Sequence, residues 1–142
     1  MAKHRWTMLS AIGGSILELK DGYALGELPL SDLVKQPTGV FHAGAIVTLA
    51  DEVASAAIFG EYTEDPSAQN KKFPYSIQLS VNLLTNDPVG PLRAEARVVR
   101  PGGATVVDTV VTTSSGETAA LMRSVHRMVD LKKVGPHKKT PG

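Results

Sequence analysis

The sequence predicts an α+β domain in which a curved antiparallel sheet wraps around one central helix. Apolar residues recur at helical spacing in one long stretch, from about Ala43 to Phe59. From about residue 76 the pattern changes to an alternation with a period of two, which is typical of strands, and a hairpin pattern precedes the helix. Because the strands surround a single helix instead of alternating with several, we expect an α+β arrangement. The many alanines in the helix leave little side-chain bulk, so a sheet can approach it closely.

The segment before the helix predicts a β-hairpin. Asp-Gly at 21–22 separates two short apolar runs, at 15–20 and 23–28, and both turn residues tolerate the positive φ that a tight hairpin requires. We expect a short helical turn to follow, as far as about Lys35, which proline and then Gly39 end.

The predicted central helix has a polar stripe on one face. Residues three and four apart are neighbours on a helix, and the stripe consists of Thr48, Asp51, Glu52 and Ser55. Gly60 lies where this helix is expected to end. A buried carboxylate is costly unless it is paired, hydrogen-bonded or at an opening. The two acids therefore lie on a solvated face, or they face a ligand groove or a second copy of the chain.

Four further strands are expected after the helix, at about 76–85, 91–100, 104–113 and 118–131. In the first of them, four apolar residues alternate with polar ones, which predicts that one face lies on the core: Ile77, Leu79, Val81 and Leu83. The segment 61–74 is polar and holds proline, so we expect an exposed loop there.

Length and composition narrow the function classes. The 142 residues are enough for one domain, which we expect at 1–131, followed by a flexible basic tail at 132–142. A net charge of +1 gives no reason to expect nucleic acid or an anionic membrane as the main partner. The absence of cysteine excludes disulfides, thiolate metal sites and a cysteine nucleophile. The N-terminal residues show no signal-peptide pattern, and two acids interrupt the longest apolar stretch, so we expect no membrane span and a cytoplasmic protein.

A motif at the start of the helix resembles a known family. The order Gln36, Gly39, His42-Ala43-Gly44, Leu49-Ala50-Asp51, followed by the strand SIQLSVNLL and by GPLRAEARVVRPG, resembles the hotdog-fold acyl-CoA thioesterases of the phenylacetyl-CoA and 4-hydroxybenzoyl-CoA type. The resemblance covers about residues 10 to 130. It implies a hotdog fold, edge-to-edge homodimers, often homotetramers, and active sites at the dimer interface.

The resemblance assigns catalytic roles near the helix. Asp51 matches the family's carboxylate, which acts as a general base or attacks the thioester itself. The backbone N–H of Ala43 matches the oxyanion donor, although the family has glycine at this position and the methyl group of alanine narrows the approach. Gln36 matches an amide that orients the nucleophile or the thioester, with an ordinary loop amide as the alternative.

Three further residues near the motif are candidates. His42 either holds the turn by hydrogen bonding or touches the substrate, and Gly44 completes the turn. Ser55 matches a position that carries Ser or Thr in some relatives, with a surface serine as the alternative. Glu52 is assigned no catalytic role, because it points about 100° away from Asp51.

The resemblance also implies contacts to coenzyme A. Arg100, Gly102 and Gly103 lie where relatives bind its phosphates, and Asn82 lies on the strand that lines the acyl pocket. No cluster of residues has the spacing of a metal site, so we expect the acyl-CoA thioester as substrate and no metal or other cofactor. The alternatives are a hotdog hydratase or dehydratase, a non-catalytic acyl-CoA binding protein, and a structural oligomer with a decayed site.

Overall fold

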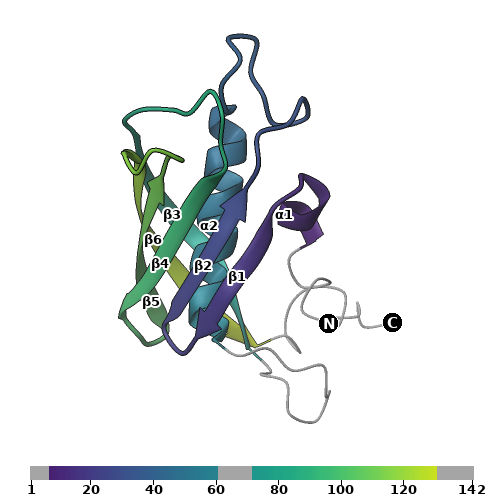
Figure 1. Ribbon diagram of the computed structural model, residues 1–142. Coiled ribbons are helices and arrows are strands. Elements are labelled where there is room, and N and C mark those ends of the chain that lie inside the picture. The colour runs from purple at the N-terminus through teal and green to yellow at the C-terminus, as the bar shows by residue number, and fades with distance from the viewer. Residues whose placement is uncertain (1–6, 61–71, 131–142) are drawn as a thin grey trace.

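The computed structural model describes residues 7–60 and 72–130, which form two helices and one sheet of six strands. The elements are α1 (Thr7–Ala11), β1 (Ser15–Lys20), β2 (Tyr23–Leu28), α2 (Ala43–Phe59), β3 (Lys72–Leu83), β4 (Leu92–Arg100), β5 (Ala104–Thr112) and β6 (Thr118–Asp130). All neighbouring strands are antiparallel, in the order β1-β2-β4-β5-β6-β3 (Figure 1). The predicted α+β class is therefore confirmed. The predicted basic tail lies outside the described residues.

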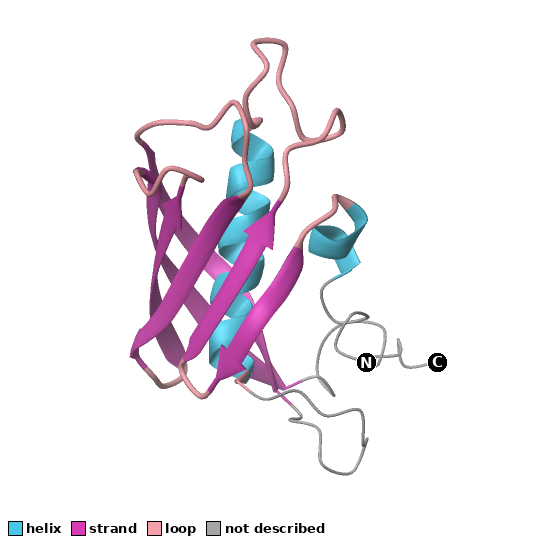
Figure 2. Cartoon of the chain, in the orientation of Figure 1, coloured by secondary structure: helices cyan, strands magenta, loops and turns pink. Residues whose placement is uncertain are grey.

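The sheet curves around α2, which runs along its concave side (Figure 2). Ile46, Leu49 and Val53 of α2 are buried among apolar residues of the surrounding strands. Close approach depends on small residues at the contact: a Cβ added at Gly26 of β2 would lie 2.5 Å from Cγ2 of Val53. The predicted helix ends as expected at Gly60, which has φ 63° and donates its N–H to the carbonyl of Ala56 at 2.9 Å.

The predicted hairpin is also confirmed. Lys20 pairs with Tyr23, and Gly22 between the two strands has φ 75°, which favours glycine. The expected helical turn before Lys35 is a single turn, in which the N–H of Val34 donates to the carbonyl of Ser31 at 3.2 Å.

Strand β3 differs from its prediction at its beginning and in its register. It begins at Lys72, so the prediction of a loop through residue 74 is wrong at its end, while 61–71 lie outside the described residues. Pro74 is tolerated because β3 is the last strand of the sheet, where a missing N–H need not break a ladder. A bulge between Ser76 and Gln78 interrupts the pairing with β6, so Ile77 is not in phase with the apolar residues after it.

The edge strand β3 leaves apolar side chains uncovered in the single chain. We predicted that Ile77, Leu79, Val81 and Leu83 would lie on the core; Val81 packs against it, but the other three are exposed by 39 to 56%. Tyr75 of the same strand is also 39% exposed. Long, apolar edge strands are unusual in isolated domains, because they pair readily with another strand.

Helix α1 was not predicted, because five residues are too few to show a helical period. Its Leu9 is fully buried in the core. The chain passes so close to Leu9 at Gly14 that a Cβ there would lie 2.3 Å from Cδ1 of Leu9. In this way α1 covers part of the helix face that the sheet leaves open.

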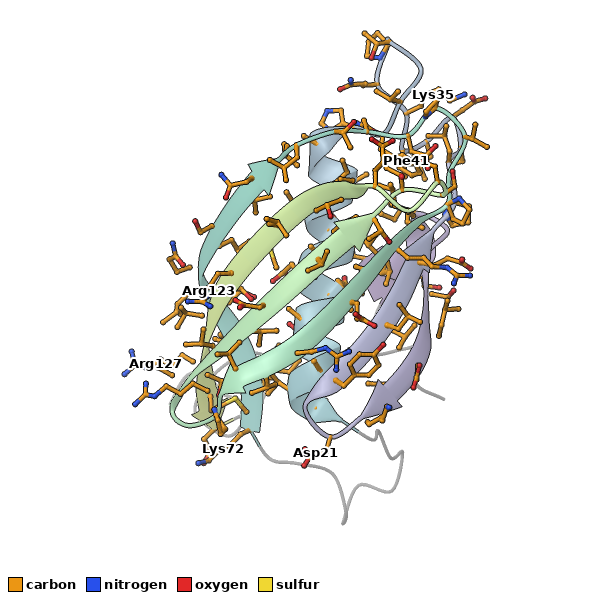
Figure 3. All side chains as sticks on the ribbon, turned by 60° about the vertical axis from the view of Figure 1, so that its left-hand side comes forward. Asp21, Lys35, Phe41, Lys72, Arg123 and Arg127 are labelled. Atoms are coloured by element: carbon orange, nitrogen blue, oxygen red, sulfur yellow. The ribbon has the colours of Figure 1, made fainter. Side chains whose placement is uncertain are left out.

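Two loops meet at the N-terminal end of α2, near Lys35 and Phe41 in Figure 3. Asn86 accepts the N–H of Phe41 at 3.0 Å and donates to its carbonyl at 2.9 Å. Asp87 is buried and accepts the N–H groups of Val89, Gly90 and Ser114 at 2.6 to 2.8 Å. Burial alone would raise the pKa of Asp87, but these backbone donors hold it well below its usual value. These bonds fix the segment that leads into the helix.

Among the described residues, no helix has both the length and the apolar character needed to cross a bilayer.

Candidate active site

The turn before α2 presents a backbone N–H at the helix start. His42 is the N-cap, and its Nδ1 accepts the N–H of Gly44 at 2.9 Å. The carbonyl of His42 accepts the N–H groups of Ala45 and Ile46 at 3.0 and 3.2 Å. The N–H of Ala43 has no hydrogen-bond acceptor in the described part of the chain. The predicted turn-holding bond of His42 is therefore confirmed, and it leaves Ala43, not Gly44, with a free donor at the positive end of the helix dipole.

Gln36 lies in the loop that precedes this turn. Its backbone N–H donates to the carbonyl of Val40 at 2.8 Å, and its side chain donates to Oγ1 of Thr38 at the same distance. The amide thus has a local partner in the single chain, at the helix end where Ala43 lies.

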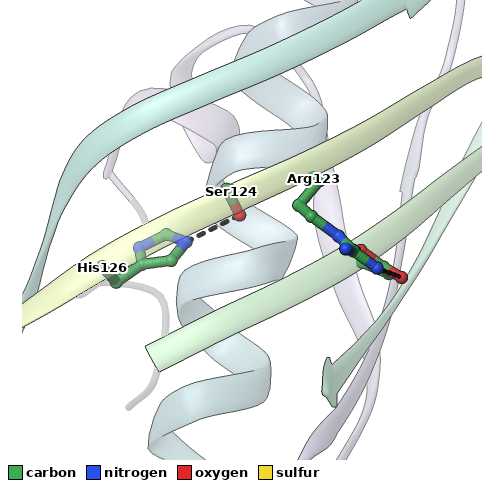
Figure 4. A network of polar contacts seen from close by, with 4 residues as sticks. Arg123, Ser124 and His126 are labelled. Atoms are coloured by element: carbon green, nitrogen blue, oxygen red, sulfur yellow. Dashed lines mark hydrogen bonds and ion pairs between the residues drawn. The ribbon is translucent and has the colours of Figure 1, made fainter. Parts of the chain in front are cut away.

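Asp51 lies farther along α2, where the helix meets the edge strand β3. Ser76 of β3 donates its hydroxyl to Oδ1 of Asp51 at 2.6 Å. Oγ of Ser76 also lies 3.3 Å from Nδ1 of His126 on β6, and Nε2 of the same ring lies 2.8 Å from Oγ of Ser124. Figure 4 shows the His126–Ser124 bond on one side of β6, with Arg123 on the other. The carboxylate is therefore the end of a chain of polar contacts that leads into the core.

The core end of this chain of contacts is formed by His126 and Ser124. His126 and Ser124 are both fully buried. Burial lowers the pKa of His126, although the charge of Asp51 and a bond to the backbone of Pro74 oppose the shift. Ser76 and His126 were not predicted as site residues. They are far from Asp51 in the sequence, and only the pairing of the strands brings the three residues together.

A cavity of about 240 Å³ opens beside Asp51. Its lining combines the helix stripe with the first residues of β3: Asp51, Glu52, Ser55, Phe73, Pro74, Tyr75 and Ser76. Phe73 packs edge-to-face on Tyr75 and on Phe59, with ring centroids 5.4 Å apart in both pairs. The cavity thus has a carboxylate at one side and an aromatic wall at the other, and it includes Ser55, which is buried and not a surface serine.

Glu52 is not on a solvated face. Burial raises its pKa, the backbone N–H of Leu9 in α1 opposes the shift, and the neighbouring charge of Asp51 adds to it. Its Oε2 atom is buried and has no hydrogen-bond partner among the described residues. Helix α1 therefore covers part of Glu52, which also lines the cavity beside Asp51.

The predicted contacts to coenzyme A are not brought together with Asp51 in one chain. Asn82 is exposed and lines a shallow groove on the outer face of the sheet, together with Arg123 and Asp108. Arg100 ends β4, three strands away from β3 in the sheet order. Gly102 and Gly103 form the turn after it, and a Cβ at either would meet no atom within 4 Å. In the described residues, no three potential metal ligands cluster together.

The carboxylate and the oxyanion donor are far apart within one chain. Ala43 and Asp51 are eight residues apart on α2, which corresponds to about 12 Å along the helix axis. A single thioester carbonyl cannot contact both groups of the same helix. Within this single chain, Ala43 and Asp51 therefore cannot act together on one carbonyl carbon and its oxygen.

A family model described as the thioesterase superfamily matches residues 38–120, more than half of the chain. The chain belongs to this superfamily. The match includes His42, Ala43 and Asp51 of the motif that carries the resemblance, whereas Gln36 lies before the matched range. The protein is thus a thioesterase by family, and the resemblance drawn from the sequence is confirmed.

Similar proteins agree with this assignment. The 1,4-dihydroxy-2-naphthoyl-CoA hydrolase of Listeria monocytogenes is 27% identical over 96 residues, which are 68% of this chain and 73% of that protein. A thioesterase from Staphylococcus aureus has a TM-score of 0.76 at 21% identity, covering 87% of this chain and 98% of that one. The PaaI protein of the E. coli phenylacetic acid degradation operon has a TM-score of 0.75 at 19% identity, covering 87% and 84%. These structures show that the fold of this thioesterase is the hotdog fold.

Proposed function

We propose that this protein hydrolyses an acyl-CoA thioester at a site shared by two copies of the chain. The observation that carries the proposal is the pair formed by a free N–H at Ala43 and a hydrogen-bonded carboxylate at Asp51, too far apart to act on one carbonyl within one chain. Two antiparallel copies of α2, related by a two-fold axis between these positions, bring each donor next to the carboxylate of the other copy.

The reaction follows from these two groups. Asp51 takes a proton from water as the water oxygen attacks the thioester carbon, or its carboxylate attacks that carbon directly. Negative charge develops on the carbonyl oxygen, which the Ala43 N–H of the other copy and the helix dipole stabilise. With water as the nucleophile, the C–S bond then breaks, the thiolate takes up the proton, and the products are the free acid and coenzyme A. With the carboxylate as the nucleophile, C–S cleavage releases the thiolate and leaves a mixed anhydride on Asp51; water then hydrolyses this anhydride to the free acid, and the proton released neutralises the thiolate.

The edge strand is the surface that we propose for the homodimer. Its exposed side chains include Ile77, Leu79 and Leu83, and an edge strand offers unpaired backbone groups to a second β3. Because Ser76 of β3 holds Asp51, pairing at this edge also places the two sites beside the dimer axis. Two such dimers form the proposed tetramer, and the proposed location is the cytoplasm.

The cavity beside Asp51 is the proposed acyl site. A cavity of about 150 Å³ with apolar walls is enough to hold benzene, and the cavity here is about 240 Å³ with Phe73 and Tyr75 as its aromatic wall. The Listeria relative is named for an aromatic acyl group, and a structural relative from Streptococcus mutans is described as bound to acetyl-CoA. These observations support an aromatic acyl-CoA as the preferred substrate class.

The test is the release of free thiol from a panel of aromatic and straight-chain acyl-CoA esters. We expect turnover by the wild type and a loss of about a hundredfold or more in Asp51→Asn, as for a lost catalytic base. Asp108→Asn is the matched control, because Asp108 is paired with Arg123 on the outer face, at 2.7 Å, and its substitution leaves the site intact. Binding of the esters without any thiol release by the wild type would instead identify a non-catalytic acyl-CoA binding protein.

A further inference from the structure

Three polar contacts connect Asp51 with the core, and the donor and the acceptor of each can be assigned. The contacts run from Oδ1 of Asp51 to Oγ of Ser76 at 2.6 Å, from there to Nδ1 of His126 at 3.3 Å, and from Nε2 of His126 to Oγ of Ser124 at 2.8 Å. The hydroxyl of Ser76 has one hydrogen, and the ionised carboxylate can only accept. The hydrogen of Ser76 is therefore directed to Asp51, and its oxygen can only accept from His126.

This fixes the tautomer of the imidazole. To donate to Ser76, His126 must carry its hydrogen on Nδ1, and a neutral ring then has an acceptor at Nε2, to which the hydroxyl of Ser124 donates. His126 also bonds to the backbone of Pro74, which in the Nδ1–H form shares the one ring hydrogen with Ser76. Proline has no N–H, so its carbonyl must accept, and Pro74 is on β3, the same strand as Ser76.

On the other side of β6, the described part of β5 does not compete with Ser76 for the ring. Thr105 of β5, the residue paired with His126, is buried and donates its own hydroxyl to the carbonyl of Gly102 at 2.7 Å. Asp51 is the one charged group found to act on the ring in the described part of the chain. All donated hydrogen bonds of the chain therefore point toward Asp51.

We infer that His126 is a positioning residue for Asp51, acting through Ser76. Its Nδ1–H donates to Oγ of Ser76, so the hydroxyl hydrogen of Ser76 is left to donate to Oδ1 of Asp51. Oδ2 remains the oxygen that meets water or the thioester carbon. This inference rests on the proposed function, because positioning matters only if Asp51 acts on a substrate.

Two amide variants of His126 separate positioning from packing. The amide nitrogen of asparagine falls near the position of Nδ1, whereas that of glutamine falls near Nε2. His126→Asn keeps a donor toward Ser76, and we expect kcat within about threefold of the wild type. His126→Gln loses that donor, and we expect kcat to fall about tenfold with little change in KM, as for one lost hydrogen bond. Equal activity of the two variants, at equal thermal stability, would overturn the inference.

The effect must also depend on Ser76. In a Ser76→Ala background, His126→Gln is expected to lower kcat no further, because the residue through which it acts is gone. Independent losses that multiply in the double variant would show a structural role and overturn the inference.

A spectroscopic measurement keeps the test separate from catalysis. Long-range ¹H–¹⁵N spectra of the wild type at neutral pH report the tautomer of each histidine, and the signal absent in His126→Asn assigns His126 among the four histidines. We expect the neutral Nδ1–H form; the Nε2–H form or a protonated ring would overturn the chain. If the wild type hydrolyses no thioester but shows the Nδ1–H form, the proposed function fails while the hydrogen-bond chain stands.

Discussion

The proposed oxyanion donor, the backbone N–H of Ala43, can be removed only by substitution with proline, which has no N–H. Ala43 is the first residue of α2, where proline fits a helix best, and His42 before it has φ −65° and ψ 138°, the extended conformation that a following proline favours. Ala43→Pro therefore removes the proposed oxyanion donor and keeps the helix. We expect kcat to fall about a hundredfold or more, as for one lost oxyanion donor. Circular dichroism checks the fold, and wild-type activity in a folded variant would remove Ala43 from the mechanism.

A substitution of Ala43 by glycine tests what the methyl group does at a position where the family has glycine. If the methyl group narrows the approach to the thioester, Ala43→Gly is expected to raise kcat/KM for bulky acyl groups and to leave small ones unchanged. The measurement is the ratio of kcat/KM between a bulky aromatic ester and acetyl-CoA. A ratio equal to that of the wild type would mean that the methyl group lies away from the substrate.

Asp87 links a single residue to acid stability. Its pKa in the folded protein is held below the ordinary value of 3.8 by backbone donors, so the unfolded chain binds its proton more readily. The contribution of Asp87 to the free energy of unfolding is therefore complete above pH 3.8 and is lost as the pH falls below it. We expect Asp87→Asn to be less stable at neutral pH and to lose less stability on acidification, which denaturant unfolding at several pH values measures. Parallel pH curves would contradict this.

Some residues of the candidate site could be predicted from the sequence, and others could not. His42, Ala43 and Asp51 are close in sequence, so the motif revealed them together. Ser76 and His126 come from two strands that only the antiparallel pairing of β3 and β6 places beside α2. Asn82 stays a predicted contact of the acyl group; it is exposed on the outer face of the sheet, away from Asp51 of the same chain.

At the scale of elements, the long helix and the hairpin followed from periodicity and turn residues, because both signals are local. The start of β3 could not be predicted, because Lys72 and Pro74 are residues typical of loops. A strand tolerates such a proline only at the edge of a sheet. Helix α1 was missed for a similar reason: its five residues are held by the burial of Leu9, a tertiary contact.

The edge strand gives a prediction of its own. Leu79 is 39% exposed in the single chain, and pairing of two β3 strands would bury it. A charge there is costly to bury, so we expect Leu79→Lys to produce a folded monomer without thioesterase activity. Val89→Lys is the control, because Val89 is 73% exposed in a loop outside the strand. Light scattering measures the mass; an active dimer of Leu79→Lys would place the interface elsewhere.

At the scale of the whole molecule, the fold holds the two proposed catalytic groups at separate places. α2 carries the proposed oxyanion donor at its start and the proposed catalytic carboxylate two turns later, and the loops fixed by Asn86 and Asp87 hold the first while the edge strand holds the second. The sequence identified both groups, but only the helix geometry shows that one chain cannot use them together. In the proposed dimer, each active site therefore combines Ala43 of one copy with Asp51 of the other.

Mixing two inactive variants tests whether each active site combines residues of two copies. Ala43→Pro and Asp51→Asn are unfolded together, refolded as a mixture and assayed for thiol release, with different tags to confirm mixed dimers. In a shared site, each mixed dimer has one intact site out of two, so random mixing is expected to restore about a quarter of wild-type activity. If mixed dimers form and activity stays at the level of the separate variants, both groups act within one chain and the account is wrong.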